Sequence, residues 1–527
     1  MELHGKNLLG SQVSAMGNST ISAYDPRQGK TLSPPFFEAT REEIHGALEL
    51  AEQAFHTFRL RSPEESARFL EAIAKELKGL KDALSERAVQ ETGLTMDRLD
   101  AEFIRTQNQI RLFTSLVREG SWVDARIDHG DAERKPVRKP DVRRMLIPIG
   151  PVVVFGASNF PFAFSVAGGD TISALAAGNP VVVKSHPAHP GTSELAARAI
   201  VKAVKVCGLA EGVFSMLHGS DPEVGLALVR HPLTKAVAFT GSQRAGRALF
   251  DAATHRPDPI PVYAEMGSVN PIFVLPGALR ERSETLAQGV IRSVTLGVGQ
   301  FCTCPGLLVG VESDDLMRLT GRLKELFKQA PSGPMFYPQL LQSYQHSIDS
   351  LRSIPGVQLT SSNAVADPTK TEALPTLVET DVTTFAGHGT LRQEVFGPST
   401  VIVKCGSREA MMQVARLLEG SLTATLHGTE NDLIEHRELT SLLETKVGRL
   451  IFNGYPTGVE VCPAMHHGGP FPATLDPKFT SVGTAAIQRF VRPICYQDFP
   501  QEALPAELQD ANNRKIWQMV DGQLTKT

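Results

Sequence analysis

Polar side chains follow four hydrophobic, strand-like runs, each close to the point where the run ends. They are Asn159 after 152–155, Lys184 after 181–183, Ser242 after 236–239 and Glu265 after 261–264. In an open parallel sheet, ligands bind outside the carboxyl ends of the strands. Because four separate runs supply polar groups at the same end, we expect one ligand-binding crevice at that edge of the sheet.

The turn from Gly241 to Gly246 is a candidate phosphate site. It opens a predicted helix, where free backbone N–H groups and the helix dipole favour an anion. It matches neither the G-x-G-x-x-G fingerprint nor a P-loop, because no lysine follows the second glycine. Taken alone, a plain strand-to-helix turn is the simpler interpretation. Lys184 alone is equally open, since a lysine at a strand end usually just reaches solvent.

Cys302 lies in a loop that could present a nucleophile. The segment 297–306, GVGQFCTCPG, breaks the helix expected over about 286–296. An accessible cysteine near backbone N–H groups can have a lowered pKa and act as a nucleophile. A structural thiol, or half of a metal site shared with Cys304, is the alternative at this point.

The overall composition sets the class of protein. A length of 527 residues predicts two or three domains, and the hydrophobic (42%) and charged (21%) fractions are those of a globular protein. The net charge of −4 indicates neither a nucleic-acid nor a membrane partner. No apolar run is long enough to span a bilayer, and residues 1–10 lack the apolar region of a secretory signal. Six cysteines without paired metal-ligand spacing indicate a reduced, cytoplasmic protein that binds no metal.

Helices and strands alternate along most of the chain. The first third is mainly helical, with a capping box at Thr40 and Glu43. From Pro151 onward, continuous apolar strands alternate with helices, which predicts a parallel sheet covered on both faces. Further strand-like runs predict a second α/β domain; they are 271–275, 307–310 and 400–403.

The segment 131–140 differs from its surroundings because it is highly charged and contains Pro136 and Pro140. Neither a core helix nor a central strand tolerates that pair of prolines. We expect an exposed arm or edge hairpin that faces solvent or another subunit, in preference to a nucleic-acid patch.

In chain order, these motifs resemble the aldehyde dehydrogenase superfamily over about 19–500. The motifs are Asn159-Phe160-Pro161, Lys184, Phe239-Thr240-Gly241-Ser242, Ala264-Glu265-Met266-Gly267, Gly299-Gln300-Phe301-Cys302 and Glu394-Val395-Phe396-Gly397-Pro398. The segments 467–472 and 481–484 are similar to the NADP-accepting branch that includes 2-oxoglutarate semialdehyde (2,5-dioxopentanoate) dehydrogenases. The resemblance implies an oxidoreductase that converts an aldehyde to a carboxylate.

The resemblance also implies a role for each catalytic residue. Cys302 attacks the aldehyde carbon, and the Asn159 amide with the Cys302 backbone N–H stabilises the oxyanion. After hydride transfer to the nicotinamide, Glu265 activates the water that hydrolyses the thioester. Structural roles are the alternatives: Glu265 would pair with a lysine and Asn159 would brace a turn.

For the cofactor, the resemblance implies residues from both predicted domains. Lys184 would bind the adenosine ribose, Ser242 the phosphates and Glu394 the nicotinamide ribose. The full expected set is Phe155, Lys184, Gly241, Ser242, Gly246, Glu394 and Phe396.

Two positions depart from the wider superfamily. NAD-preferring members usually carry a glutamate three residues after the lysine, which binds the ribose 2′-OH and repels a 2′-phosphate. Here that position is Pro187, so we expect NADP to be accepted, with NAD as an alternative. The second is His467, which the superfamily at large does not require. It would either lie near Cys302 and tune the thiolate or have a structural role.

Other functions make different demands on the same residues. A CoA-acylating aldehyde dehydrogenase would not need Glu265 to activate water. A non-catalytic structural relative would be expected to lose Cys302, Glu265 or Asn159. All three are present, which favours an enzyme that hydrolyses its thioester.

The identity of the aldehyde depends on the residues of the substrate tunnel. A semialdehyde such as 2-oxoglutarate semialdehyde needs an arginine for its distal carboxylate. By position the candidates are Arg105, Arg111 and Arg292. Phe160, Phe162, Phe164 and Phe471 could instead line an apolar tunnel for an aliphatic aldehyde, as in a broad-specificity enzyme.

The expected fold class is α/β, with two doubly wound parallel-sheet domains and a small β oligomerisation arm. The expected boundaries are 1–134 with 150–275 for the Rossmann-like cofactor domain, 276–480 for the catalytic domain, and 135–149 with 481–505 for the arm. Residues after 505 are not assigned to an element. We expect a homodimer or a homotetramer.

Overall fold

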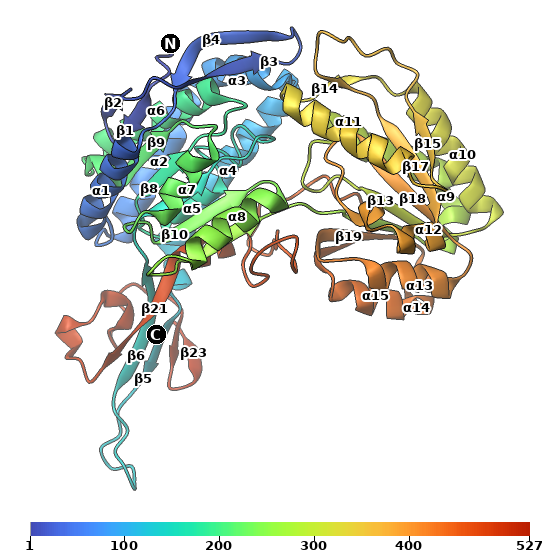
Figure 1. The fold of residues 1–527 in the computed structure, drawn as a ribbon. Coiled ribbons are helices and arrows are strands. Elements are labelled where there is room, and N and C mark those ends of the chain that lie inside the picture. The colour runs from blue at the N-terminus through green and yellow to red at the C-terminus, as the bar shows by residue number, and fades with distance from the viewer. Residues whose placement is uncertain (1) are drawn as a thin grey trace.

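The computed structural model describes residues 2–527, which form two α/β domains and a β arm that projects from them (Figure 1). The two doubly wound domains predicted from the sequence are therefore present. Among the residues described, no helix is long and apolar enough to cross a membrane.

The first domain is built on a seven-stranded sheet in the order β11-β10-β7-β8-β9-β1-β2. β11, β10, β7, β8 and β9 run parallel, whereas β1 pairs antiparallel with β9 and β2. The strands are β1 (Asn7–Leu9), β2 (Gln12–Ser14), β7 (Val152–Phe155), β8 (Val181–Lys184), β9 (Phe214–Leu217), β10 (Ala236–Thr240) and β11 (Val262–Glu265). β7 lies between β8 and β10, so the strand order reverses at β7, where open α/β sheets bind their ligands.

Helices cover both faces of this sheet. They are α1 (Arg41–Phe58), α2 (Pro63–Gly79), α3 (Lys81–Thr92), α4 (Met96–Glu119), α5 (Gly169–Ala176), α6 (Pro190–Val206), α7 (Pro222–Arg230) and α8 (Gln243–Thr254). The capping box predicted for Thr40 and Glu43 is confirmed at the start of α1. Alternate β7 side chains enter different cores: Val152 and Val154 pack with α2, α4, α5 and α6, and Val153 and Phe155 with α1, α7 and α8. A hairpin of β3 (Thr20–Asp25) and β4 (Lys30–Phe37) lies at the edge of this domain.

The second domain has its own seven-stranded sheet, in the order β15-β17-β18-β13-β12-β19-β20. All neighbouring strands are parallel except β15 and β17. The strands are β12 (Pro271–Val274), β13 (Leu307–Val311), β15 (Gln358–Ser361), β17 (Thr376–Asp381), β18 (Ser399–Cys405), β19 (Ser421–His427) and β20 (Val447–Phe452). A separate short pair joins β14 (Gly333–Pro334) to β16 (Glu372–Ala373).

Helices of the second domain also lie on both faces of its sheet. α9 and α10 pack on one face, and α13 and α15 on the other. The helices are α9 (Pro276–Thr295), α10 (Asp314–Gln329), α11 (Pro338–Arg352), α12 (Val382–Gly387), α13 (Arg408–Leu417), α14 (Glu430–Glu435) and α15 (Arg437–Glu444).

The arm is a five-stranded sheet in the order β21-β6-β5-β22-β23. Its strands are β5 (Ala125–Asp128), β6 (Val142–Pro148), β21 (Val491–Gln497), β22 (Gln518–Val520) and β23 (Gln523–Thr525). The sheet thus begins before residue 135 and includes the C-terminal residues that the sequence left unassigned. Segment 481–490, expected in the arm, instead buries Phe490 in the core of the first domain. Local sequence patterns could not show which strands form the arm, because its strand pairs join segments that are far apart in the chain.

Candidate active site

A cavity of about 770 Å³ lies at the carboxyl ends of β7, β8, β10 and β11 and extends to the second domain. Both domains contribute predicted residues to its wall, and these are Phe155, Asn159, Lys184, Gly241, Ser242, Glu265, Cys302, Glu394 and Phe396. Gly246 lies in the first turn of α8, where a Cβ atom would come within 2.8 Å of Met266 Sδ. The structure therefore brings the four strand ends together at one crevice, opposite the Cys302 loop.

The Cys302 loop is held by side-chain amides. The Asn270 Nδ2 group donates to the carbonyl oxygens of Cys302 (2.8 Å) and Cys304 (3.0 Å). The Asn159 Nδ2 group donates to the carbonyl oxygen of Gln300 (3.2 Å). Cys302 itself is half-buried and lines the cavity, so its thiol can reach a ligand there.

Cys304, two residues on, has a different environment. Its thiol is buried and points towards the carbonyl oxygens of Val294 and Gly397, at 3.8 and 4.0 Å. Burial raises the pKa of Cys304 to about 12. Within residues 2–527, no cluster of potential metal ligands includes Cys304. Among the described residues, Cys302 and Cys304 therefore do not share a set of potential metal ligands.

Glu265, His467 and Cys302 form a compact group: Glu265 and Cys302 line the cavity, and His467, which does not, contacts both. The His467 Nε2 atom lies 3.0 Å from Glu265 Oε1 and 3.6 Å from Cys302 Sγ. The Ser481 hydroxyl donates to Oε2, the other carboxylate oxygen of Glu265. His467 and Glu265 are almost completely buried, with 1% and 4% of their surfaces exposed. The carboxylate therefore has fixed donors on both oxygens.

The segment that carries His467 and Ser481 is irregular and runs alongside β11. The backbone N–H of Met266 donates to the Ala473 carbonyl (2.8 Å), and that of Leu475 to the Ala264 carbonyl (3.2 Å). Gly469, with φ of +155°, approaches the Ser421 carbonyl so closely that a Cβ atom would lie 2.4 Å from its oxygen. Gly469 thus allows this segment to pack against the start of β19.

Burial and hydrogen bonding set opposite charge states for the two reacting groups. Burial, reinforced by the nearby Glu265 carboxylate, raises the pKa of Cys302 well above its usual value. Burial also acts to raise the pKa of Glu265, but the charge and hydrogen bond of His467 and the hydrogen bond of Ser481 outweigh it, so the net pKa is lowered. In the resting site the thiol keeps its proton and the carboxylate is ionised. The ionised Glu265 is a nearby acceptor for the proton of Cys302, and the two pKa shifts make that transfer unfavourable in the resting site.

The rest of the cavity wall carries groups that could bind a phosphorylated ligand. Ser242 caps α8 and accepts a hydrogen bond from the Ala245 N–H (3.3 Å), so the helix N-terminus faces the cavity. Lys184 lies at the end of β8, where burial lowers its pKa to about 8. Glu394 faces Gly267, where a Cβ atom would lie 2.4 Å from Glu394 Oε2, and burial raises the pKa of Glu394 to about 7. The wall thus has a cation, a helix N-terminus and a carboxylate.

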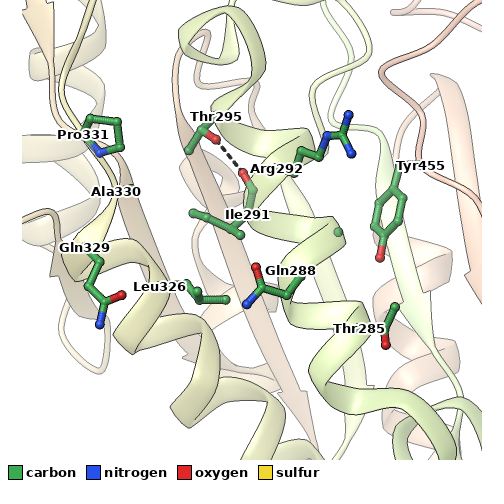
Figure 2. A pocket seen from close by; sticks show the side chains of 11 residues that line it. Thr285, Gln288, Ile291, Arg292, Thr295, Leu326, Gln329, Ala330, Pro331 and Tyr455 are labelled. Carbon is green, nitrogen blue, oxygen red and sulfur yellow. Dashed lines mark hydrogen bonds between the residues drawn. The ribbon is translucent and has the colours of Figure 1, made fainter.

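The three arginines that could bind a substrate carboxylate lie in different environments. Arg111 is exposed on α4 and donates to Asn108 (3.0 Å). Arg292 is exposed on α9, where with Gln288 and Tyr455 it lines a separate surface pocket of about 590 Å³ (Figure 2). None of the catalytic candidates lines that pocket. Arg105 is half-buried on α4 and close enough to Cys302 to interact with its charge.

The four phenylalanines that could line an apolar substrate tunnel also lie in different environments. Phe162 is buried in the first core against Phe103, and Phe471 is 51% exposed. Phe160 and Phe164 lie together, with ring centres 5.3 Å apart, and Phe160 also contacts Phe301 at 5.3 Å. Phe160 and Phe164 are therefore the two that pack next to the residue preceding Cys302.

Sequence reasoning missed Ser481, Asn270 and Gln300. Ser481 lies in a run that the sequence associated with one branch of a family, but no role followed from that pattern. Asn270 has a φ of +50°, a conformation that asparagine adopts more readily than most residues, yet a turn would have explained it equally well. Their contacts depend on segments that are distant in the chain.

The comparison with protein families agrees with this geometry. The model of the aldehyde dehydrogenase family matches residues 13–470. The chain belongs to this family. It is 47% identical to alpha-ketoglutaric semialdehyde dehydrogenase 2 of Azospirillum brasilense, over 99% of this chain and 100% of that protein. It is 44% identical to alpha-ketoglutaric semialdehyde dehydrogenase of Acinetobacter baylyi, over 100% and 99%.

Solved aldehyde dehydrogenases share the fold. Betaine aldehyde dehydrogenase of Staphylococcus aureus in complex with NAD+ superposes with a TM-score of 0.80 at 17% identity, over 94% of this chain and 96% of that one. The present aldehyde dehydrogenase is thus an oxidoreductase with an NAD(P)-binding fold.

Proposed function

We propose that this enzyme oxidises 2-oxoglutarate semialdehyde to 2-oxoglutarate, with NAD(P) as hydride acceptor. The observation that carries the reaction type is that a thiol, a carboxylate and an amide, those of Cys302, Glu265 and Asn159, line one cavity. The substrate is supported by the full-length similarity to two alpha-ketoglutaric semialdehyde dehydrogenases, since α-ketoglutarate is 2-oxoglutarate.

Acylation begins with proton transfer from the Cys302 thiol to the Glu265 carboxylate. The sulfur then forms a bond to the aldehyde carbon, and the carbonyl oxygen becomes an oxyanion. The Asn159 amide and the Cys302 backbone N–H are the donors for this oxyanion, and one such donor typically lowers the barrier by ~3 kcal/mol. When bound, the nicotinamide supplies the acceptor for the hydride that leaves the same carbon.

Deacylation depends on Glu265 acting as a base for water. Its carboxylate is kept ionised and oriented by His467 and Ser481, within 4.8 Å of the Cys302 sulfur. Before deacylation Glu265 releases to solvent the proton that it took from Cys302. Water then attacks the thioester carbon and passes a proton to Glu265, and the tetrahedral intermediate expels the Cys302 sulfur as a thiolate. The nearness of Glu265 to Cys302 favours hydrolysis over transfer of the acyl group to CoA.

Steady-state kinetics with three aldehydes test the proposed substrate. We expect kcat/KM for 2-oxoglutarate semialdehyde to exceed that for succinic semialdehyde and hexanal. A higher kcat/KM for hexanal would instead indicate the alternative, a broad-specificity aliphatic aldehyde dehydrogenase.

We propose further that NADP is accepted as well as NAD. Position 187 carries a proline, so no carboxylate there opposes a 2′-phosphate, and Lys184 provides the cation. Because burial lowers the pKa of Lys184 to about 8, its positive charge is present below that pH and lost above it. We therefore expect kcat/KM for NADP to fall as the pH rises through about 8, more steeply than kcat/KM for NAD.

The control for this pH effect is Lys184→Arg, because a guanidinium keeps its charge at pH 9. The variant should retain NADP activity across the range in which the wild type loses it. A strong preference for NAD at every pH would contradict the proposal.

For His467 we propose a positioning role through Glu265. Replacing it by alanine removes the charge and hydrogen bond that keep the pKa of Glu265 low, while burial remains. Glu265 would then be protonated at higher pH, so the acid limb of the kcat profile should shift upward. A pH–rate profile that is unchanged in His467→Ala would show that the histidine has only a structural role.

We propose that the arm joins subunits in a homodimer or homotetramer. It extends away from both domains (Figure 1), and its small core contains only arm residues and their immediate neighbours. Such a sheet leaves strand edges free for pairing with another subunit.

A further inference from the structure

The guanidinium of Arg105 lacks the partners that a buried cation normally has. Arg105 is half-buried on α4, and its Nη1 atom is buried without a hydrogen-bond partner among residues 2–527. Within the same residues it takes part in no hydrogen bond or ion pair. An arginine carries five N–H donors and a permanent charge, so an unpaired buried guanidinium is costly. This side chain therefore calls for an anion supplied by a ligand.

Arg105 is close to the reacting groups. Its guanidinium lies 5.1 Å above the centre of the Phe164 ring, and that ring lies 6.4 Å from the ring of His467. Burial lowers the pKa of Arg105, whereas the charges of Glu102, Cys302 and Glu265 oppose that shift. The cation is thus within electrostatic reach of both the nucleophile and the base.

Arg105 approaches Cys302 from outside the cofactor cavity. Neither Arg105 nor the aromatic residues Phe160, Phe164 and Phe301 line that cavity, although Cys302 does. If a nucleotide fills the cavity, the aldehyde must reach Cys302 from the side on which these aromatic rings lie. Arg105 therefore lies on the side where the end of the substrate distal to its aldehyde group would be.

Neighbouring arginines are already engaged. Arg98 forms an ion pair with Glu102 at 2.8 Å. Arg449, the other arginine near Cys302, donates to the carbonyl oxygens of Gly458 and Pro456, each at 2.7 Å. Arg98 Nη2 also lacks a partner, but of these three side chains only Arg105 has no hydrogen bond or ion pair at all among residues 2–527, which leaves its whole guanidinium edge for a bidentate contact.

We infer that Arg105 binds the distal carboxylate of a semialdehyde substrate whose aldehyde carbon reaches Cys302. A planar guanidinium can bind both oxygens of a carboxylate, which orients the chain between them. The inference rests on the proposed function for the identity of the substrate. It adds the residue that distinguishes a carboxylate-bearing aldehyde from a neutral one.

Three variants test this assignment: Arg105→Met removes the charge at similar length, Arg105→Lys keeps the charge but not the fork, and Arg111→Met removes an exposed arginine from the same helix. The readout is the ratio of kcat/KM for 2-oxoglutarate semialdehyde to kcat/KM for hexanal. We expect Arg105→Met to lower this ratio by about tenfold to a hundredfold, mainly through KM. Arg105→Lys should lower it less, and Arg111→Met should leave it unchanged.

The outcomes separate the two proposals. A wild-type enzyme that prefers hexanal would refute the proposed substrate. A ratio that is unchanged in both Arg105 variants would refute the role of Arg105, whichever aldehyde the wild type prefers. An equal loss with both aldehydes would also refute it, because a general defect lowers both values together. Thermal shift of each variant by 2-oxoglutarate gives a second measure: the shift should be lost in Arg105→Met and kept in Arg111→Met.

Discussion

Replacing Cys302 by alanine should reduce kcat/KM for the aldehyde by about 10⁴-fold or more. The sulfur makes the covalent bond on which every later step depends, and removal of a nucleophile usually eliminates most of the catalytic effect. The alanine side chain is smaller and the loop is held by Asn270 through backbone carbonyls, so the fold should be retained. Steady-state kinetics, with a nucleotide-binding measurement to show that the site is intact, would test this.

Cys304→Ala is the matched control, because it removes a second thiol from the same loop. Its sulfur is buried against Val294 and Gly397 and does not line the cavity. We expect some loss of stability and little change in kcat/KM. Strong activity in Cys302→Ala together with inactivity in Cys304→Ala would show that the nucleophile has been misassigned.

Glu265→Gln should separate the two halves of the reaction. Glutamine cannot take a proton from water, so deacylation should slow and kcat should fall by about 10²- to 10⁴-fold. Acylation loses its proton acceptor as well, but loss of the carboxylate charge removes one of the causes that raise the pKa of Cys302, so the thiol can lose its proton to solvent more readily and acylation should slow less than deacylation. Rapid mixing with aldehyde and cofactor should then show a burst of about one reduced nucleotide per site, followed by slow turnover.

The covalent state of Cys302 provides the control. Mass spectrometry of Glu265→Gln after the burst should find the acyl group on this cysteine, and hydroxylamine should release it. The absence of both burst and adduct would mean that Glu265 is needed chiefly for acylation. Faster turnover of the wild type with CoA, yielding acyl-CoA, would favour the CoA-acylating alternative.

Much of the fold followed from local patterns. Buried parallel strands are continuous apolar runs, so β7, β8 and β10 are visible in the sequence without knowledge of their neighbours. Polar residues at strand ends are equally local, because the carboxyl ends of parallel strands share one edge of the sheet. The crevice, with Asn159, Lys184 and Glu265 around it, could therefore be predicted before the structure was known.

Contacts between segments that are distant in the chain could not be predicted from the sequence. Ser481 and His467 meet Glu265 through an irregular segment that runs beside β11, and no periodic pattern marks it. The sequence could not rank the three candidate arginines, because Arg105, Arg111 and Arg292 are the same residue type. They differ in the burial of their side chains and in their hydrogen-bond partners, which depend on the elements that pack against α4 and α9.

The amino-acid sequence by itself determined the α/β class, the two domains, the four strand ends and the candidate nucleophile Cys302, because each depends on neighbouring residues. Only the tertiary structure decided the hydrogen bonds of Glu265, the burial of the Cys304 thiol away from the cavity, the strands of the arm and the unpaired guanidinium of Arg105. Those features depend on residues brought together from different parts of the chain, and the free energy of a buried charge depends on all of its neighbours.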